Sequence, residues 1–152
     1  MENKYKWNLN DIYSSNDEFG DDVKKIYELL KTVENYKGKL AKSSQNIYEC
    51  YRNYESIIEK FDKVYAYGML KYHQNMANTA NIELFKKVEN ISTDISTKTV
   101  FITLEITDIP EEKLLEYINT NDKLKRYERV LKEIIEDKKH VLSDKEEDII
   151  AN

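Results

Sequence analysis

The chain has 152 residues, and its 24 Lys and Arg against 29 Asp and Glu give a formal net charge of −5. One Pro and three Gly are too few turn formers for a β-sandwich or a β-barrel, which need a turn about every 8–12 residues. The negative charge argues against nucleic-acid binding, and no apolar run is long enough to span a membrane. We therefore expect one domain over residues 1–152, with a core of its own and no secretory signal at its start.

The first helix is expected to follow an irregular start that carries Trp7 and Tyr13 among its apolar anchors. Ser15 or Asn16 can cap this helix, because their side-chain oxygens accept the free N–H groups of a first turn. Five apolar residues follow at spacings of 4, 3, 4 and 3, which places them on one helical face: Phe19, Val23, Ile26, Leu30 and Val33. Gly38 is expected to end the helix.

A second helix is expected from Ser43 or Ser44 to about Asn75. Its apolar stripe alternates spacings of 4 and 3 and consists of Ile47, Tyr51, Tyr54, Ile58, Phe61, Tyr65, Gly68 and Tyr72. Three more residues widen the stripe on one flank: Cys50, Ile57 and Val64. A wide stripe favours a helix packed against several neighbours over a two-stranded coiled coil, and Gly68 would let another backbone come close.

The third segment gives conflicting signals. Apolar residues at helical spacing run from Ile82 to Ile95, whereas residues 100–107 alternate like a β-strand and are rich in β-formers. A lone strand would leave its backbone N–H and C=O groups unpaired, and no other segment resembles a partner strand. We therefore predict a helix here by exclusion.

Three further helices are expected towards the C-terminus. Pro110 suits the first turn of a short helix, and another helix starts near Asp122. Ser143 and Glu146 have the spacing of a capping box, which predicts that a last helix opens at Ser143 and has barely begun at residue 152. The predicted fold class is all-α, an antiparallel bundle of about five to six helices joined by short turns. The unfinished last helix suggests a chain cut from a longer one.

Residue types that carry chemistry are sparse. The chain has two histidines, His73 and His140, one cysteine, Cys50, and no HExxH motif, whereas a zinc site needs three or four converging ligands. Cys50 is expected as a small buried residue, and His140 at a helix end. Adjacent carboxylates fall in predicted first turns, where the helix dipole explains them. We assign no catalytic, metal-binding or cofactor-binding residue in this chain.

Twelve tyrosines are the unusual part of the composition. Several cluster with polar residues near the end of the second helix, and four residues of this cluster are candidates to face a peptide: Tyr65, Tyr72, His73 and Gln74. Their hydroxyl, imidazole and amide groups could meet the backbone of a bound peptide. The same residues could instead form the rim of a helical core, and the sequence leaves both interpretations open.

Four segments give the chain a resemblance to a known family. The opening of oligoendopeptidase F-type zinc metallopeptidases resembles residues 7–13, WNLNDIY, and the turn after their first helix resembles residues 36–40, YKGKL. Their second helix is similar to residues 62–78, DKVYAYGMLKYHQNMAN. The most specific match is residues 127–150, YERVLKEIIEDKKHVLSDKEEDII, where a Tyr, a Leu, a basic run, His, Leu-Ser and paired Glu follow the family's order.

The resemblance implies a cytoplasmic enzyme that hydrolyses oligopeptides, with zinc held by an HExxH helix in a C-terminal catalytic domain. None of those residues lies in this chain, so the resemblance implies that residues 1–152 are inactive alone. It further implies that they partner the catalytic domain of the same polypeptide and help to enclose the cavity for the oligopeptide substrate. The alternative is a standalone, non-catalytic helical module that binds another protein. Neither interpretation involves nucleic acid or a membrane.

Overall fold

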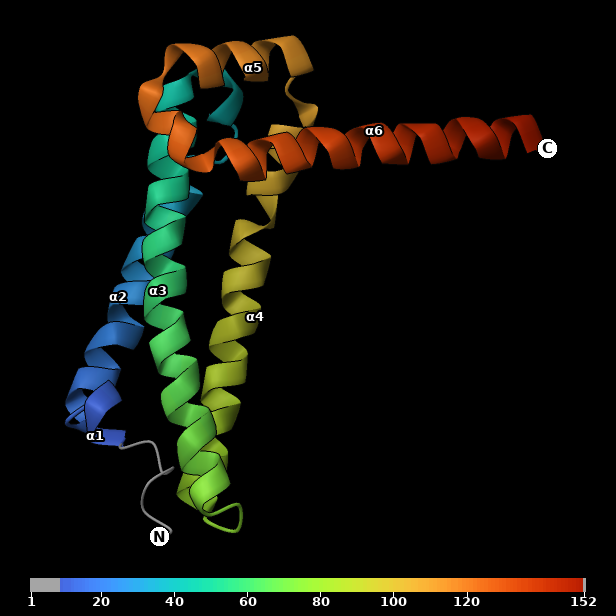
Figure 1. Cartoon of the computed structure of the whole chain (residues 1–152). Helices are drawn as coiled ribbons and strands as arrows, with labels where there is room; N and C mark the ends of the chain where they lie inside the picture. The colour runs from blue at the N-terminus through green and yellow to red at the C-terminus, as the bar shows by residue number, and fades with distance from the viewer. Residues whose placement is uncertain (1–8, 152) are drawn as a thin grey trace, which may run out of the picture. The chain divides into compact units, whose positions relative to one another are not determined.

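Figure 1 shows the computed structural model, which describes residues 9–151. Trp7, one of the expected anchors, lies outside these residues. The elements are α1 (Leu9–Ile12), α2 (Asn16–Glu34), η2 (Leu40–Lys42), α3 (Ser44–Gln74), α4 (Thr79–Asp108), α5 (Glu111–Thr120), η3 (Asp122–Tyr127) and α6 (Glu128–Ala151). The predicted all-α class is confirmed, because residues 9–151 form six α-helices and two 3-10 helices and contain no strand.

The chain forms two compact units, and α3 and α4 each contribute to both. The first unit consists of Met1–Glu34 and Asn53–Thr99, and the second unit of Asn35–Arg52 and Val100–Asn152. In the first unit, α2 runs beside the later part of α3 and the earlier part of α4 (Figure 1). Successive helices of this unit point in opposite directions, as an antiparallel bundle requires.

Helix α2 begins as the sequence predicts, because the Ser15 hydroxyl accepts the backbone N–H of Glu18 at 3.3 Å. The five predicted core residues of this helix are all buried: Phe19, Val23, Ile26, Leu30 and Val33. The helix ends at Glu34, and Gly38 adopts a positive φ of 80° in the turn that follows. The start of the chain is more regular than expected, because residues 9–12 form α1 and Tyr13 is buried.

The buried face of α3 differs from the predicted stripe. Ile57 and Val64 were expected on the flank, yet both are fully buried, with 0% of their surface exposed. Two residues from the centre of the predicted stripe lie at the edge of the core instead, because Phe61 is half-buried and Tyr65 is 42% exposed. Compared with the predicted stripe, the buried side of α3 is therefore shifted around the helix towards Ile57 and Val64.

Two neighbouring helices decide which side of α3 is buried. On one side, the Tyr67 ring packs on Phe19 of α2 with the ring centroids 5.2 Å apart, and the Tyr67 hydroxyl donates to Asn16 Oδ1 at 3.0 Å. On the other side, Gly68 lies so close to α4 that an added Cβ would come within 2.8 Å of Cγ2 of Val88. The surface of α3 between these two contacts becomes the core of the first unit.

Helix α4 confirms that residues 100–107 are helical in spite of their strand-like alternation. The Thr107 hydroxyl donates to the carbonyl of Thr103 at 2.7 Å, so this β-branched residue finds its partner within the helix itself. Phe101 and Ile102 are neighbours in sequence and are both buried. A strand would have placed these two side chains on opposite faces, whereas a helix places them on one broad face.

The second unit forms its core from α5, η2, η3 and the adjoining parts of α3, α4 and α6. Its fully buried side chains include Leu40, Ile47, Ile106, Leu114, Ile118, Leu124 and Leu131. Pro110 occupies the N-cap position of α5, one residue before the first turn, and its carbonyl accepts the N–H of Leu114 at 3.0 Å. Tyr51 of α3 stacks on Tyr127 with the ring centroids 5.3 Å apart, which joins α3 to the end of η3.

Helix α6 runs without a break from Glu128 to Ala151, so the prediction of a separate helix opening at Ser143 is wrong. A capping box acts where the N–H groups of a first turn have no carbonyl partner. The residues before Ser143 are already helical, so their carbonyls accept those N–H groups. The spacing of Ser143 and Glu146 therefore starts no new helix. His140 consequently lies within α6, and its expected position at a helix end is also wrong.

Candidate functional site

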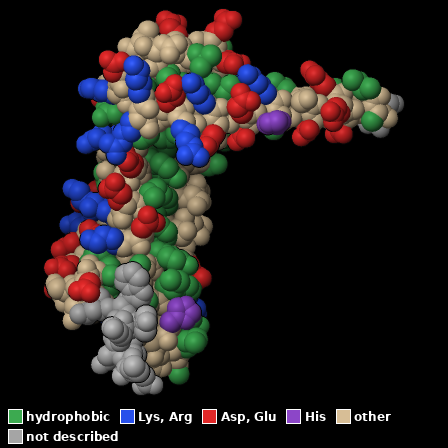
Figure 2. Space-filling model, viewed as in Figure 1, with side chains coloured by type: hydrophobic (Ala, Val, Ile, Leu, Met, Phe, Trp, Pro, Cys, Tyr) green, Lys and Arg blue, Asp and Glu red, His purple; other side chains and the backbone are tan. Residues whose placement is uncertain are grey.

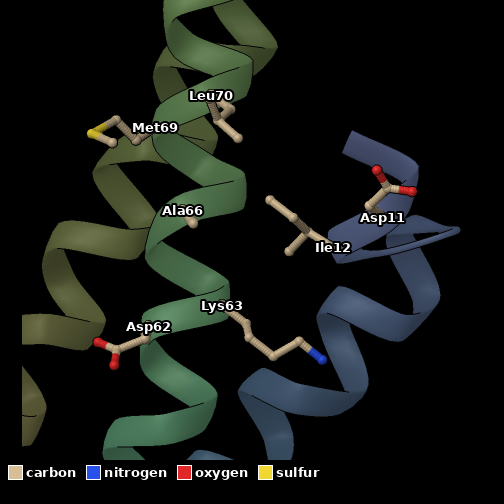
Figure 3. A pocket seen from close by; sticks show the side chains of 7 residues that line it. All are labelled: Asp11, Ile12, Asp62, Lys63, Ala66, Met69 and Leu70. Atoms are coloured by element: carbon tan, nitrogen blue, oxygen red, sulfur yellow. The ribbon is translucent and has the colours of Figure 1, made fainter. Parts of the chain in front are cut away.

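A pocket of about 520 Å³ lies between α1 and α3 in the first unit (Figure 3). Its lining consists of Asp11, Ile12, Asp62, Lys63, Ala66, Met69 and Leu70. Ile12 points from α1 towards Ala66, whereas Asp62 and Met69 point from α3 away from α1. Apolar side chains make up most of the lining, so the pocket suits an apolar group.

Lys63 links the rim of this pocket to the buried Tyr13. The Lys63 ammonium lies 5.4 Å from the centre of the Tyr13 ring, and the Tyr13 hydroxyl donates to Asp22 Oδ2 at 2.6 Å. Burial, helped by the Asp22 carboxylate, raises the pKa of Tyr13 well above its ordinary value. Tyr13 therefore stays protonated at neutral pH and serves as a structural hydrogen-bond donor.

No pattern in the amino-acid sequence predicts this pocket. Ala66 and Leu70 lie one helical turn apart on an apolar face of the helix. The charged residues Asp62 and Lys63 occupy the turn before them, so the apolar pattern is short. The opposite wall comes from Ile12, about 50 residues earlier in the chain, and only the tertiary fold brings it to α3. The sequence predicted an irregular start to the chain, whereas residues 9–12 form the short helix α1 that carries Ile12.

The four candidate peptide-facing residues all lie on α3, and none of them lines the pocket. Tyr72 stacks on Phe85 of α4 with the ring centroids 5.0 Å apart, and the His73 ring meets Tyr72 edge-on at 5.5 Å. Gln74 is the exposed last residue of α3, and Tyr65 is 42% exposed two turns earlier. The structure thus brings Tyr72 and His73 together beside Phe85.

The turn between α3 and α4 is held in place by side-chain amides. Asn81 Nδ2 donates to the carbonyl of Lys71 at 3.0 Å and to that of Asn75 at 3.4 Å. Asn75 Oδ1 in turn accepts the backbone N–H of Ala77 at 3.2 Å. These bonds fix the end of α3, which carries Tyr72, His73 and Gln74.

The thiol of Cys50 is not a reactive centre. Cys50 is fully buried as expected, and burial raises the pKa of its thiol to about 12, with a smaller effect from the Glu105 carboxylate. The thiol is therefore protonated and unreactive at neutral pH. Between residues 9 and 151, no group of three or more His, Cys, Asp or Glu is placed to hold a metal ion. Over the same range, no helix combines the length and apolar character needed to cross a membrane.

Comparison with known proteins identifies related sequences over almost the whole chain. Residues 105–152 match a family model described as Oligopeptidase F. The chain is 32% identical to Oligopeptidase PepF of Bacillus subtilis, over 95% of this chain and 22% of that protein. It is 28% identical to an Oligoendopeptidase F homolog of Borreliella burgdorferi, over 97% of this chain and 25% of that protein.

A solved structure shares the fold. The crystal structure of oligoendopeptidase-F from Enterococcus faecium matches with a TM-score of 0.75 and 23% sequence identity, over 90% of this chain and 26% of that chain. At this identity the match is evidence for the fold alone.

The helical fold and the sequence matches make this chain similar to the N-terminal region of a known class of peptidase. More specifically, it is homologous to the N-terminal region of oligopeptidase F, which confirms the resemblance seen in the sequence. The chain spans about a quarter of the length of the curated relatives it matches.

Proposed function

We propose that this chain is the N-terminal helical domain of an oligoendopeptidase F-like zinc metallopeptidase that hydrolyses oligopeptides. The chain helps to enclose the peptide-binding cavity and acts as one domain, residues 1–152, beside the C-terminal catalytic domain of the same polypeptide. The observation that carries the proposal is the 32% identity to Oligopeptidase PepF over 95% of this chain. The family resemblance also leads us to propose a cytoplasmic location.

The proposal assigns zinc to the catalytic domain. A zinc ion does not fit the described part of this chain, because no three His, Cys, Asp or Glu side chains converge there. The contribution that remains for these residues is to contact and orient a peptide and to exclude bulk water from it.

The peptide-facing role falls to Tyr65, Tyr72, His73 and Gln74. Its support is local: His73 and Gln74 are exposed, and next to them in the chain Tyr72 stacks its half-buried ring on Phe85. If peptide contacts this surface, His73→Ala in the full-length gene product should raise KM for an oligopeptide severalfold and leave kcat nearly unchanged. Tyr117→Phe is the control and should leave KM unchanged. The Tyr117 hydroxyl donates to the carbonyl of Ala41 within the second unit, whereas His73 belongs to the first unit.

The central test compares the full-length gene product with the 152-residue chain. The full-length protein should cleave a quenched fluorescent oligopeptide, lose this activity with a zinc chelator, and recover it when zinc is restored. The 152-residue chain should neither cleave the peptide nor retain one equivalent of zinc after dialysis. A reading frame without HExxH downstream, or tight one-to-one zinc uptake by residues 1–152, would overturn the proposal.

The alternative function, a standalone module that binds another protein, is favoured by one observation. Several large apolar side chains of α6 are exposed: Val141, Leu142, Ile149 and Ile150. A standalone module that uses this surface should self-associate, and light scattering would then report a stable oligomer. A clean monomer that acquires peptidase activity only in the full-length protein would favour the domain proposal.

A further inference from the structure

The apolar stripe of α6 continues beyond the core that it serves. Leu131 and Ile135 are buried in the second unit, with 0% and 8% of their surface exposed. Leu142 and Ile149 follow Ile135 at intervals of seven residues, which keeps them on the same side of the helix. These two residues are 51% and 76% exposed. The helix therefore presents a core-like stripe that no part of the second unit covers within the described residues.

A groove connects this stripe to α4. The groove has a volume of about 300 Å³, and its walls include Val141 and Leu142 of α6 and Thr103 and Thr107 of α4. All four residues belong to the second unit, so the groove lies within one compact body.

The adjoining face of α4 is also apolar and exposed. Val100 and Leu104 share a face with the two groove threonines, because all four follow one another at spacings of 3, 1 and 3. Val100 is 56% exposed and Leu104 is 59% exposed. We call the set Val100, Leu104, Val141, Leu142 and Ile149 the α4–α6 apolar surface. Exposed apolar side chains of this kind are typical of an interaction site.

The charges beside this surface indicate the chemistry of its partner. The groove carries charges of both signs, because Asp137, Lys138 and Lys145 belong to its lining. Figure 2 shows hydrophobic atoms near the end of α6 beside acidic side chains. A complementary partner would present an apolar centre with charged groups of both signs at its rim. Near the middle of α6, the Lys139 ammonium pairs with Glu111 of α5 at 3.2 Å.

We propose that the α4–α6 apolar surface is the docking site for the polypeptide that follows residue 152 in the same chain, through an apolar patch. The inference rests on the proposed function. It is supported by length, because the chain covers only the N-terminal 22% of Oligopeptidase PepF and about a quarter of the other relatives. Most of the length of each relative thus lies outside the region that this chain matches. In this chain, α6 is the element from which the polypeptide would continue.

Hydrogen–deuterium exchange on the full-length gene product and on the 152-residue chain tests the proposal. Backbone amides of residues 141–150 should exchange about tenfold or more slowly in the full-length protein, while amides of α2 should exchange equally in both. In the full-length protein, the double substitution Leu142→Asp with Ile149→Asp should abolish the extra protection. The matched control is Met76→Asp, which changes a 57% exposed apolar residue in the first unit and should leave protection of residues 141–150 intact.

Two results would overturn the proposal. The first is equal exchange of residues 141–150 in the two proteins. The second is protection that appears in the 152-residue chain as its concentration rises, together with a dimer in light scattering, because a second copy would then be the occupant.

Peptidase activity, measured on the same full-length preparation, separates this inference from the proposed function. An active enzyme with unprotected residues 141–150 would refute the docking site and leave the function standing. An inactive protein with strong protection there would refute the function and leave the docking site standing.

Discussion

The Glu105 carboxylate accepts the backbone N–H of Gly38 through both of its oxygens, at 2.9 Å and 2.8 Å. The same carboxylate also accepts the N–H of Leu40 at 3.4 Å. A side chain near the end of α4 thereby satisfies the N–H groups of the turn that precedes α3. Because the acceptor is charged, these hydrogen bonds are stronger than bonds between neutral groups.

Replacing Glu105 with Ala should destabilise the protein. The substitution removes the acceptor for two turn N–H groups, and we expect the free energy of unfolding to fall by about 1–3 kcal/mol. Glu105→Gln keeps one carbonyl acceptor and should cost less. Urea denaturation followed by circular dichroism would measure both variants, and an Ala variant as stable as the parent would refute a structural role for this contact.

Two glycines should respond to alanine with opposite signs. Gly38 has a φ of 80°, so Ala there should destabilise the protein by about 1–2 kcal/mol, the cost of a left-handed conformation for an L-residue. Gly20 lies inside α2 with open space around its Cα, so Ala should stabilise the protein by about 0.5–1 kcal/mol. Thermal and chemical denaturation of the two variants would check the signs, and a shared sign would contradict this explanation.

The close approach of Gly68 to Val88 should not tolerate a side chain. Ala at position 68 would place its Cβ 2.8 Å from Val88 Cγ2, and the branched valine has little rotamer freedom to move aside. We expect a loss of about 1–3 kcal/mol from overpacking. In a double-mutant cycle, Gly68→Ala with Val88→Ala should cost less than the sum of the single variants. Additive costs would show that the two residues do not press on each other.

The position of the core on α3 can be tested with one pair of variants. Ile57→Ala should cost about 2–5 kcal/mol, because Ile57 is fully buried and its removal leaves a cavity. Phe61→Ala should cost less even though phenylalanine is larger, since Phe61 is only half-buried. Equilibrium denaturation would compare the free energies of unfolding of the two variants. A larger loss at Phe61 would indicate that the buried face of α3 is the stripe that the sequence predicted.

Tyr27 should make stability depend on pH in the alkaline range. Its hydroxyl donates to Asp94 Oδ2 at 2.5 Å, and burial together with this carboxylate raises the pKa of Tyr27 from 10.0 to about 12. Because the folded pKa exceeds the unfolded one, the stabilisation is complete below pH 10 and declines as the pH rises towards 12.

The matching experiment follows unfolding between pH 8 and pH 12. Tyr27→Phe should be less stable than the parent near neutral pH, and the difference should shrink above pH 10. Asp94→Asn, which removes the charge that opposes ionisation of Tyr27, should weaken the alkaline decline in the same way. A difference that stays constant up to pH 12 would contradict the assignment.

Much of the fold follows from local patterns in the sequence. Helix α2 is the clearest case, because the Ser15 cap and the five-residue stripe from Phe19 to Val33 are all present in the structure. Residues 100–107 are a subtler case, since their alternation favours a strand and only the lack of a partner strand identifies a helix. The homology to the N-terminal region of oligopeptidase F was also apparent from short motifs.

Other features depend on where the helices meet. The α1–α3 pocket needs Ile12 and Ala66 to face each other, and no local pattern carries that information.

The sequence by itself determined that this chain is helical, where α2 and α3 begin, and which family it resembles, because caps and periodic apolar residues act within a few turns of one helix. Only the tertiary structure decided which side of α3 is buried and that α6 continues through Ser143. The physical reasons differ. On α3, contacts with distant elements, such as Val88 against Gly68, select one side of a broad apolar stripe. At Ser143, the carbonyls of the preceding turn of α6 accept the N–H groups that a capping box would bind.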